Sequence, residues 1–413
     1  MTQDKTKFFL DSFELFVTNE IIKRYDPWTY DAPLACNSKR VAQFQALQRA
    51  VLILADGIAT NFDDLSPWLP YDNKIKRFFN KLSDKPLRAG VFRPDFLITK
   101  DSRLIMFEIT CRFPLNGIFQ SIGLNRLPKI RNFTHARNIE VCDYTAVLAQ
   151  TFLEWAGESD AVWIIQGNES SRNESVVLQS HFDNTLPLPF VYMPLQSFIA
   201  LDPREFAGSK AIVAEINFEE WQQIPDSHID AMFACPLAND PRFVFIAHDK
   251  SFFALPFIDE IAANVLEEQE ASLLRSHFAK TYLPGKAPEI WENALEHPED
   301  WIIKPRRLGK SKGIIAGGLV NHEDWRKHIQ NAAKNDVILQ EWHTPPYIKG
   351  SIGTESYYDL YCGTLLCWGA TFLGPGMIRA SSHEVINIKD NRKAGCIVVT
   401  NKDNETIADL QWI

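Results

Sequence analysis

Two apolar runs that carry charged residues constrain the fold of this chain most strongly. Residues 92–98 and 104–110 have the length and composition of β-strands, and Lys100-Asp101-Ser102 between them is typical of a hairpin turn. A carboxylate on a half-buried strand is costly unless it pairs with a cation or binds a metal. The charged residues here are Arg93, Asp95 and Glu108, with Arg112 just beyond them. The pattern therefore predicts a hairpin that carries a cation-binding, charge-handling site.

A structural explanation of these charges also stays open at this point. Asp95 and Glu108 could be ion-paired with Arg93 and Arg112 across the hairpin, with no ligand involved. The two explanations differ in which groups balance the charge of the acids. These are either the neighbouring arginines or groups from elsewhere in the chain.

Composition excludes several classes of protein. Hydrophobic residues make up 46% of the 413 residues and the formal net charge is -9, so a large core is available but general attraction to phosphate backbones is not. Nucleic acid is therefore not expected as a partner. A membrane is not expected either, because no apolar run reaches the ~18 residues needed to span a bilayer. Seven cysteines without a CxxC pair, and an N-terminus unlike a signal peptide, indicate a cytoplasmic protein.

The expected elements divide the chain into four regions of a mixed α/β protein. These are a mostly helical region at 1–85, an α/β core lobe at 86–245, a lobe with a Lys/Gly-rich loop at 246–345, and closing strands at 346–413. Beyond the hairpin, strands are predicted at 161–166, 211–216, 243–247, 301–304, 337–341 and 357–372.

A basic loop with two glycines follows the strand predicted at 301–304. Its candidate anion-binding residues are Lys304, Arg306, Gly309, Lys310, Lys312 and Gly313. Glycines let backbone N–H groups approach an anion and basic side chains neutralise it, so a polyphosphate is the expected ligand. Gly309-Lys310-Ser311 is not a P-loop, because that motif requires glycine where Lys304 stands. A solvated basic loop is the simpler explanation of a charge run, but the strand-final lysine favours binding.

The strand predicted at 337–341 ends in Gln340 and Glu341, and Trp342 and a proline-containing loop follow it. An adenine ring needs an apolar slot with hydrogen bonds from a strand-to-loop hinge. We therefore expect Gln340, Glu341 and Trp342 at a nucleotide-base site.

Together these segments resemble the ATP-grasp ligases, and within them the circularly permuted branch that includes the synthetase domain of glutathionylspermidine synthase. The segments that carry the resemblance are Arg93-Pro94-Asp95-Phe96, Glu108-Ile109-Thr110, residues 247–255 with Lys250 near a strand end, Lys304-Pro305 through Gly313, Gln340-Glu341 and Gly376-Met377-Ile378-Arg379. Glu108 precedes Lys304, the reverse of the order in ordinary ATP-grasp chains. The similarity covers roughly residues 88–400 and is patchy.

The resemblance implies a circularly permuted ATP-grasp fold of the α+β or α/β class, with two α+β lobes clasping ATP and an added N-terminal helical region. It also implies an ATP-dependent carboxylate–amine ligase. ATP with Mg2+ would convert a small-molecule or peptide carboxylate into an acyl phosphate, which an amine or thiol then attacks, releasing ADP and phosphate.

Each candidate residue takes an expected role from its matching position in this family. Those expected to bind magnesium are Asp95, Glu108 and Thr110. Those expected to bind ATP are Lys250 and Lys304 at the α- and β-phosphates, Arg306, Lys310 and Lys312 on the closing loop with its Gly309 and Gly313, and Gln340, Glu341 and Trp342 at the base. Those expected to act in the reaction are Arg93 on the moving phosphoryl group and Arg112 or Arg379 on the substrate carboxylate.

Thr110 departs from the family pattern, which has asparagine at this metal position. A threonine hydroxyl is a shorter and weaker oxygen donor, so water or Asn116 would have to complete the coordination. Two alternatives to a ligase follow: a nucleotide-binding protein without ligase activity, or a kinase whose reaction stops at phosphorylation. The identity of the substrates and the oligomeric state do not follow from the sequence.

Overall fold

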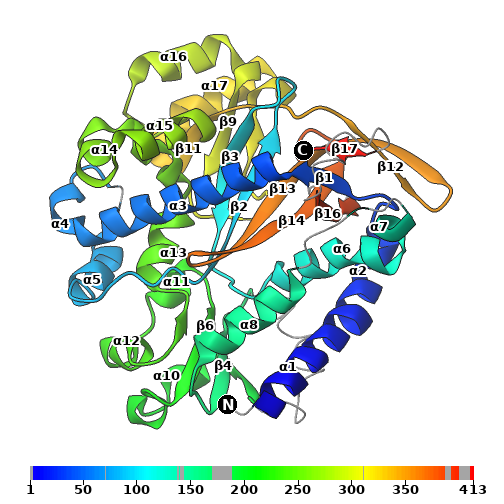
Figure 1. Cartoon of the computed structure of the whole chain (residues 1–413). Helices are drawn as coiled ribbons and strands as arrows, with labels where there is room; N and C mark the ends of the chain where they lie inside the picture. Colours follow the sequence, from blue (N-terminus) through cyan, green and yellow to red (C-terminus); the bar gives the residue numbers. More distant parts are fainter. Residues whose placement is uncertain are drawn as a thin grey trace.

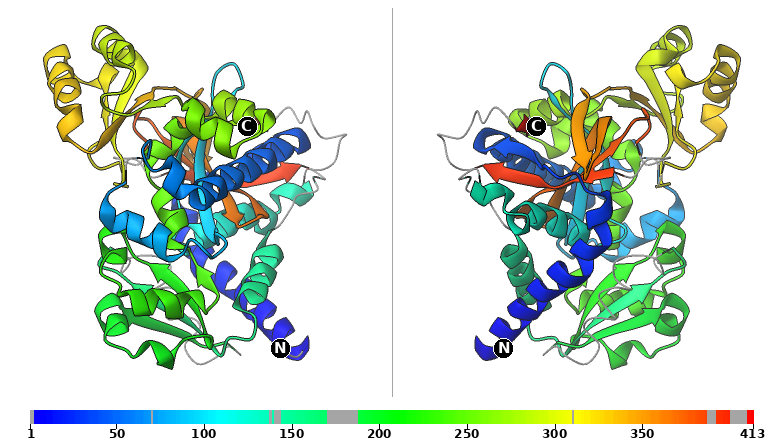
Figure 2. Two further views of the ribbon diagram at one scale, coloured as in Figure 1. Left: turned by 90° about the vertical axis from the view of Figure 1, so that its left-hand side faces the viewer. Right: turned by 90° about the vertical axis from the view of Figure 1, so that its right-hand side faces the viewer.

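The fold is described from a computed structural model, which covers residues 3–69, 71–136, 139, 144–169, 188–309, 311–386, 392–399 and 410–413. These residues form a mixed α/β molecule with four sheets (Figure 1). Figure 2 shows the lobe that contains residues 280–340 at one end, a parallel-sheet lobe at the other, and a central sheet between them. Every helix within these ranges is too short or too polar to cross a membrane.

The central sheet contains the predicted hairpin and has six strands. Their order is β15 (Arg392–Ala394), β14 (Thr371–Ser381), β13 (Glu355–Trp368), β2 (Val91–Ile98) and β3 (Leu104–Thr110), with β12 (Ile348–Ile352) also paired to β13. Strands β2 and β3 confirm the hairpin. The single strand predicted at 357–372 is wrong, because the chain reverses at Gly369, whose φ of 52° lies in the left-handed region that favours glycine.

The N-terminal region is mostly helical, and its longest helix lies across one face of the central sheet. Its helices are α1 (Gln3–Phe16), the π-helix η1 (Val17–Ile22), α2 (Lys23–Tyr25), η2 (Asp26–Trp28), α3 (Ser38–Thr60), α4 (Phe62–Leu65) and α5 (Asn73–Lys81). The Asn37 side chain caps α3 by accepting a hydrogen bond from the Arg40 N–H. The Phe44 ring then packs 4.9 Å from that of Phe96 on β2, which fixes α3 across the sheet.

One strand in this region has no counterpart among the expected elements. Strand β1 (Leu34–Asn37) pairs in parallel with β16 (Cys396–Val399) and β17 (Gln411–Trp412), so the two ends of the chain meet in one small sheet. Four residues carry too short an alternation to reveal a strand. Helices α6 (Ile118–Ile130) and α7 (Phe133–Ala136) follow the hairpin.

The parallel-sheet lobe has the strand order β5 (Phe190–Pro194), β4 (Ala161–Gln166), β6 (Lys210–Glu215) and β7 (Leu237–Ala238). Its helices are α8 (Thr145–Ala156), α10 (Leu195–Ile199), η4 (Pro203–Glu205), α11 (Phe218–Trp221) and α12 (Asp226–Phe233). The strand predicted at 243–247 is wrong, since these residues belong to helix α13 (Pro241–Ala247). Asp240 caps this helix and Pro241 begins it, while burial on all sides hides the helical period.

A connecting segment leads to the third lobe. Its elements are the 3-10 helix η5 (Lys250–Phe257), α14 (Asp259–Val265) and α15 (Glu268–His277). Lys250 therefore begins a helix capped by Asp249, and the expectation that it ends a strand is wrong. The Asp249 carboxylate accepts the Ser251 N–H at 2.9 Å, which starts the helix at this point.

The third lobe contains a four-stranded sheet, here called the lid sheet, in the order β10 (Ile315–Ala316), β9 (Trp301–Pro305), β11 (Val337–Glu341) and β8 (Thr281–Tyr282). Its helices are α16 (Pro288–Glu296), η6 (Pro298–Asp300), η7 (Gly317–Leu319), α17 (His322–Asn331) and η8 (Ala332–Lys334). Trp325 of α17 lies 1% exposed in a separate small core against Trp301 and Leu339. The lobe thus has a core of its own.

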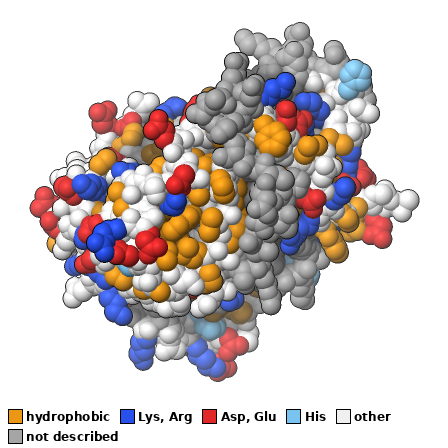
Figure 3. Space-filling model, turned by 90° about the horizontal axis from the view of Figure 1, so that it is seen from below, with side chains coloured by type: hydrophobic (Ala, Val, Ile, Leu, Met, Phe, Trp, Pro, Cys, Tyr) orange, Lys and Arg blue, Asp and Glu red, His pale blue; other side chains and the backbone are white. Residues whose placement is uncertain are grey.

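The molecular surface has mixed character on its lower face. Figure 3 shows apolar side chains gathered near the middle, with acidic and basic side chains interspersed around them.

Candidate nucleotide site

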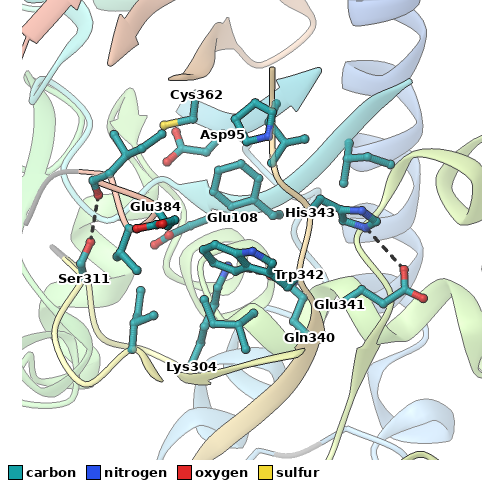
Figure 4. Close-up of a pocket in the computed structure, with 18 of the residues that line it drawn as sticks. Asp95, Glu108, Lys304, Ser311, Gln340, Glu341, Trp342, His343, Cys362 and Glu384 are labelled. Atoms are coloured by element: carbon teal, nitrogen blue, oxygen red, sulfur yellow. Dashed lines mark hydrogen bonds and ion pairs between the residues drawn. The ribbon is translucent and has the colours of Figure 1, made fainter. Parts of the chain in front are cut away.

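A cleft separates the central sheet from the lid sheet and contains most of the predicted site residues. It has an empty volume of about 750 Å3 that continues into solvent. Its charged and polar lining includes Asp95, Glu108, Lys304, Gln340, Arg379 and Glu384, and its apolar wall includes Leu97, Ile105, Phe107, Ile302, Trp342 and Pro345 (Figure 4). The lining can therefore contact both charged groups and an apolar ring.

Asp95 and Glu108 lie directly opposite each other on β2 and β3. Asp95 Oδ2 lies 2.5 Å from Arg379 Nη2, and Glu108 Oε1 lies 3.1 Å from Lys250 Nζ. Their cations therefore come from β14 and η5, which are far from the hairpin in sequence. Glu108 therefore pairs with Lys250 and not with Arg112 of its own hairpin.

The two carboxylates differ in how their surroundings affect ionisation. Burial raises the pKa of Asp95 above its usual range, although Arg379 opposes this. Burial also acts against ionisation of Glu108, but the charges of Lys250 and Lys304 outweigh it and lower the pKa to about 2. Glu108 is therefore the firmly ionised member of the pair.

A β-bulge turns a second side chain of β3 into the cleft. Asp95 pairs with Glu108 while the next residue, Phe96, pairs with Met106, so Phe107 is the extra residue. Strand alternation alone would send Phe107 and Glu108 to opposite faces, yet both line the cleft. The bulge therefore brings an aromatic ring beside the acid, which the sequence period did not predict.

Lys304 is a buried cation at the floor of the cleft. The residue is the last but one of strand β9 and is 5% exposed, and its Nζ lies 4.9 Å from the Phe107 ring centroid. Nζ donates a hydrogen bond of 2.7 Å to Gln340 Oε1. Burial lowers the pKa of Lys304 to about 8, despite the attraction of Glu108.

Lys250 joins the hairpin to the basic loop. Its Nζ contacts Glu108 and also donates a 2.7 Å hydrogen bond to the carbonyl of Leu308. The Lys250 N–H bonds the Arg306 carbonyl at 3.0 Å. Two lysines that are far apart in sequence therefore flank the same carboxylate.

Arg306 has a different position from the one expected for a residue closing over phosphates. Its guanidinium lies 2.5 Å from Asp249 Oδ2 and 2.8 Å from Asp336 Oδ1, and it does not line the cleft. Arg307 Nε also lies 3.2 Å from Asp249. Both basic residues tie the start of the loop to the cap of η5, so a structural role suits Arg306 better.

The rest of the basic loop contributes less to the cleft than expected. Lys310 lies outside the described residues, and Lys312 is exposed and not among the lining residues. Gly313 has a φ of 69°, and a Cβ there would lie 2.9 Å from Pro305, so the turn requires glycine. Ser311 lines the cleft from this loop.

Arg112 lies where three parts of the chain meet, outside the residues that line the cleft. Its Nη2 is 3.2 Å from Glu169 Oε2 beyond β4, and a Cβ on Gly309 would come within 3.1 Å of it. The guanidinium also stacks 4.7 Å from the Phe113 ring centroid. A clamp on a substrate carboxylate remains a prediction for this residue.

Arg93 and Thr110 occupy the next pair along the hairpin. They are opposite each other in register, two residues from Asp95 on β2, and so share its face. Arg93 is 5% exposed and Thr110 is half-buried. The roles expected for both residues stay predictions.

All three hinge residues line the cleft, but they differ in whether their side chains already have partners. Gln340 is 0% exposed and its amide is already hydrogen-bonded, while Glu341 pairs with Lys280 and His343. Trp342 points its indole into the cleft (Figure 4). Of the three, Trp342 is best placed to contact a base.

Sequence reasoning missed several residues that line or support the cleft. These are Phe107, His343, Cys362 and Glu384 on its walls and Asp249 behind the loop. Burial raises the pKa of the Cys362 thiol to about 11, so it is neutral. No local sequence pattern marks these residues as part of the site.

The donor set is compatible with magnesium. Two carboxylates face each other in the cleft, and Mg2+ commonly binds one or two carboxylates together with substrate phosphates and water. Among the described residues there is no group of three or more His, Cys, Asp or Glu side chains arranged for a metal. Asp95 and Glu108 would hold the ion only in company with a phosphate ligand.

Comparisons with known proteins place the fold but not the activity. The chain has 14% sequence identity and a TM-score of 0.53 to a glutathione synthetase-like effector from Globodera pallida in its apo form, with 97% of each chain covered. The overall fold is thus similar to that of a glutathione synthetase-like protein. The family described as AnkG N-terminal domain matches residues 63–246, which include the hairpin and the parallel-sheet lobe. No curated protein matches the chain.

Proposed function

We propose that this protein is an ATP-dependent ligase of the permuted ATP-grasp type, which activates a carboxylate as an acyl phosphate and joins it to an amine or thiol. The observation that carries the proposal is that Glu108 and Lys304 line the cleft, while Lys250, which is outside the lining, forms an ion pair with Glu108. Two lysines around a carboxylate can bind a triphosphate and its metal together. The similarity in fold to a glutathione synthetase-like protein agrees with this chemistry.

In this proposal the apolar lining of the cleft binds the base and the charged lining binds the phosphates. Trp342 and Phe107 would flank the adenine, and Lys304 and Lys250 would neutralise the phosphate chain. Asp95 and Glu108 would hold Mg2+, which supplies charge neutralisation on the phosphates. Their present cations, Arg379 and Lys250, would be released toward the phosphoryl group as the carboxylates bind the ion.

The remaining basic residues would serve the acceptor side of the reaction. Arg379, freed from Asp95, would stabilise negative charge on the transferred phosphoryl group, a task suited to its planar fork. Arg112 stands between β3, Glu169 and the basic loop, where a substrate carboxylate could exchange with Glu169. The loop around Gly309 would keep water from the acyl phosphate.

The test is acyl-phosphate trapping. Purified protein is incubated with ATP, Mg2+ and a panel of amino acids, peptides and dicarboxylates in the presence of hydroxylamine, and hydroxamate and ADP are measured. We expect a carboxylate-dependent hydroxamate that is absent for Glu108→Ala. ADP release without hydroxamate, and with phosphate retained on the product, would instead indicate a kinase.

A nucleotide-binding protein without ligase activity is a second candidate, because Thr110 replaces the amide expected at the metal site. It predicts that ATP raises the melting temperature while no carboxylate and amine pair releases ADP. Thr110→Asn then becomes informative, since a gain of ADP release in this variant would assign the missing activity to the metal site.

A further inference from the structure

The amide of Gln340 is the middle of a buried hydrogen-bond chain that crosses the lid sheet. Its Oε1 accepts from Lys304 Nζ at 2.7 Å, and its Nε2 donates to Thr281 Oγ1 at 2.9 Å. The Thr281 hydroxyl donates in turn to the carbonyl of Ala279 at 2.9 Å. Thr281, Gln340 and Lys304 are 3%, 0% and 5% exposed, so each bond of the chain is shielded from water.

Strand register explains how three strands supply one chain. Gln340 on β11 lies directly opposite Thr281 on β8 and opposite Ile302 on β9. Lys304 is two residues beyond Ile302, so it is the diagonal neighbour of Gln340 on the same face of the sheet. This face is the one toward the cleft, because Ile302, Lys304 and Gln340 all line it while Thr281 does not.

The direction of every hydrogen bond in the chain is fixed. An ammonium group can only donate, so the atom of Gln340 that faces Lys304 must be Oε1. The Thr281 hydroxyl gives its proton to Ala279, which leaves its oxygen free to accept from Gln340 Nε2. A reversed amide would set its NH2 group against the ammonium. Thr281, by accepting from Nε2, supports the amide orientation that the Lys304 ammonium requires.

We propose that Thr281 and Gln340 are positioning residues that hold the Lys304 ammonium in place for the phosphates of a bound nucleotide. Gln340 takes one of the three ammonium protons, which leaves the other two for phosphate oxygens. Gln340 therefore acts through Lys304 and not on the base, contrary to the role expected from its place in the hinge. The inference rests on the proposed nucleotide-binding function.

The test uses Thr281→Val, which keeps the shape of the side chain but removes the hydroxyl, with Thr281→Ser as the matched control. Calorimetric titrations with ATP and with adenosine are made on each variant in the presence of Mg2+. Adenosine has no phosphate, so a loss transmitted through Lys304 affects ATP alone. We expect Thr281→Val to weaken ATP binding about tenfold, adenosine binding to stay unchanged, and Thr281→Ser to bind ATP like the wild type.

The other outcomes distinguish a failure of this inference from a failure of the proposed nucleotide-binding function. Equal losses for ATP and adenosine, or no loss for either, would overturn the positioning role. Wild-type protein that binds neither compound would overturn the proposed nucleotide site itself. Gln340→Leu provides a second variant, and it must show the same selective loss of ATP if the chain operates as described.

Discussion

Glu108 and Lys250 form an ion pair of 3.1 Å between a strand of the central sheet and the first residue of a helix more than a hundred positions later. The charge of Lys304 also contributes to keeping Glu108 ionised. The two lysines carry more positive charge than this one carboxylate can balance. An additional anion, such as a nucleotide phosphate, would balance this excess of positive charge.

Replacing Glu108 should remove the dependence of ATP binding on magnesium. Glu108→Gln keeps the side-chain size but removes the ionised ligand, so we expect ATP affinity with Mg2+ to fall roughly 10- to 100-fold, the range seen when even an outer-shell metal partner is lost. Titration calorimetry with and without Mg2+ measures this. The control is Asp101→Asn, an exposed acid on the turn of the same hairpin. A loss of equal size in the control would contradict the assignment.

Nucleotide binding should weaken as the pH rises through about 8. Burial lowers the pKa of Lys304 to about 8, so the ammonium is charged below this pH and neutral above it. The phosphates therefore lose one cation in that interval, for a loss of affinity of roughly tenfold. In Lys304→Arg the guanidinium stays charged throughout. Binding curves at several pH values should fall for the wild type and stay flat for this variant, and parallel curves would refute the role of Lys304.

Asp249 should be important for stability. It is 0% exposed and pairs with both Arg306 and Arg307, so Asp249→Ala removes their shared buried carboxylate and leaves the more exposed Asp336 to balance two arginines. We expect the free energy of unfolding to drop by ~3–5 kcal/mol. The matched variant is Asp336→Ala, which removes a 55% exposed partner of the same Arg306 and should cost no more than about 1 kcal/mol. Urea unfolding followed by circular dichroism gives both values. Similar losses for the two variants would contradict the role of Asp249 as the buried partner of both arginines.

Trp342 should serve the base and not the phosphates. Its indole points into the cleft, so Trp342→Ala removes a stacking surface and should weaken ATP and adenosine alike, by roughly tenfold. Competition against a fluorescent adenine nucleotide measures both affinities. This is the opposite selectivity from Thr281→Val. A loss confined to ATP would show that Trp342 does not contact the base.

The sequence predicted local features of the site better than its long-range contacts. The hairpin was predictable because two apolar runs of strand length and a polar turn determine it within 20 residues or so. The strand ending in Lys304 was predictable for the same reason. The partners of the acids were not, because Arg379 and Lys250 reach Asp95 and Glu108 only through tertiary packing.

The errors of secondary structure have specific physical causes. Helix α13 is buried on all sides, so residues 243–247 show a continuous apolar run that a buried strand would also show. The bulge at Phe107 breaks the two-residue alternation of β3, and a sequence pattern does not reveal such a bulge. Arg306 seemed free to bind phosphate because nothing near it in sequence revealed that Asp249 and Asp336 would surround it.

The most direct test of the central claim is a crystal structure with a non-hydrolysable ATP analogue and Mg2+. We predict the triphosphate between Lys250 and Lys304, the metal on Asp95 and Glu108, and the base beside Trp342, with the Lys250 ammonium moved from Glu108 onto a phosphate. An analogue bound elsewhere, or a cleft whose ion pairs remain unchanged at saturating analogue and Mg2+, would contradict the account.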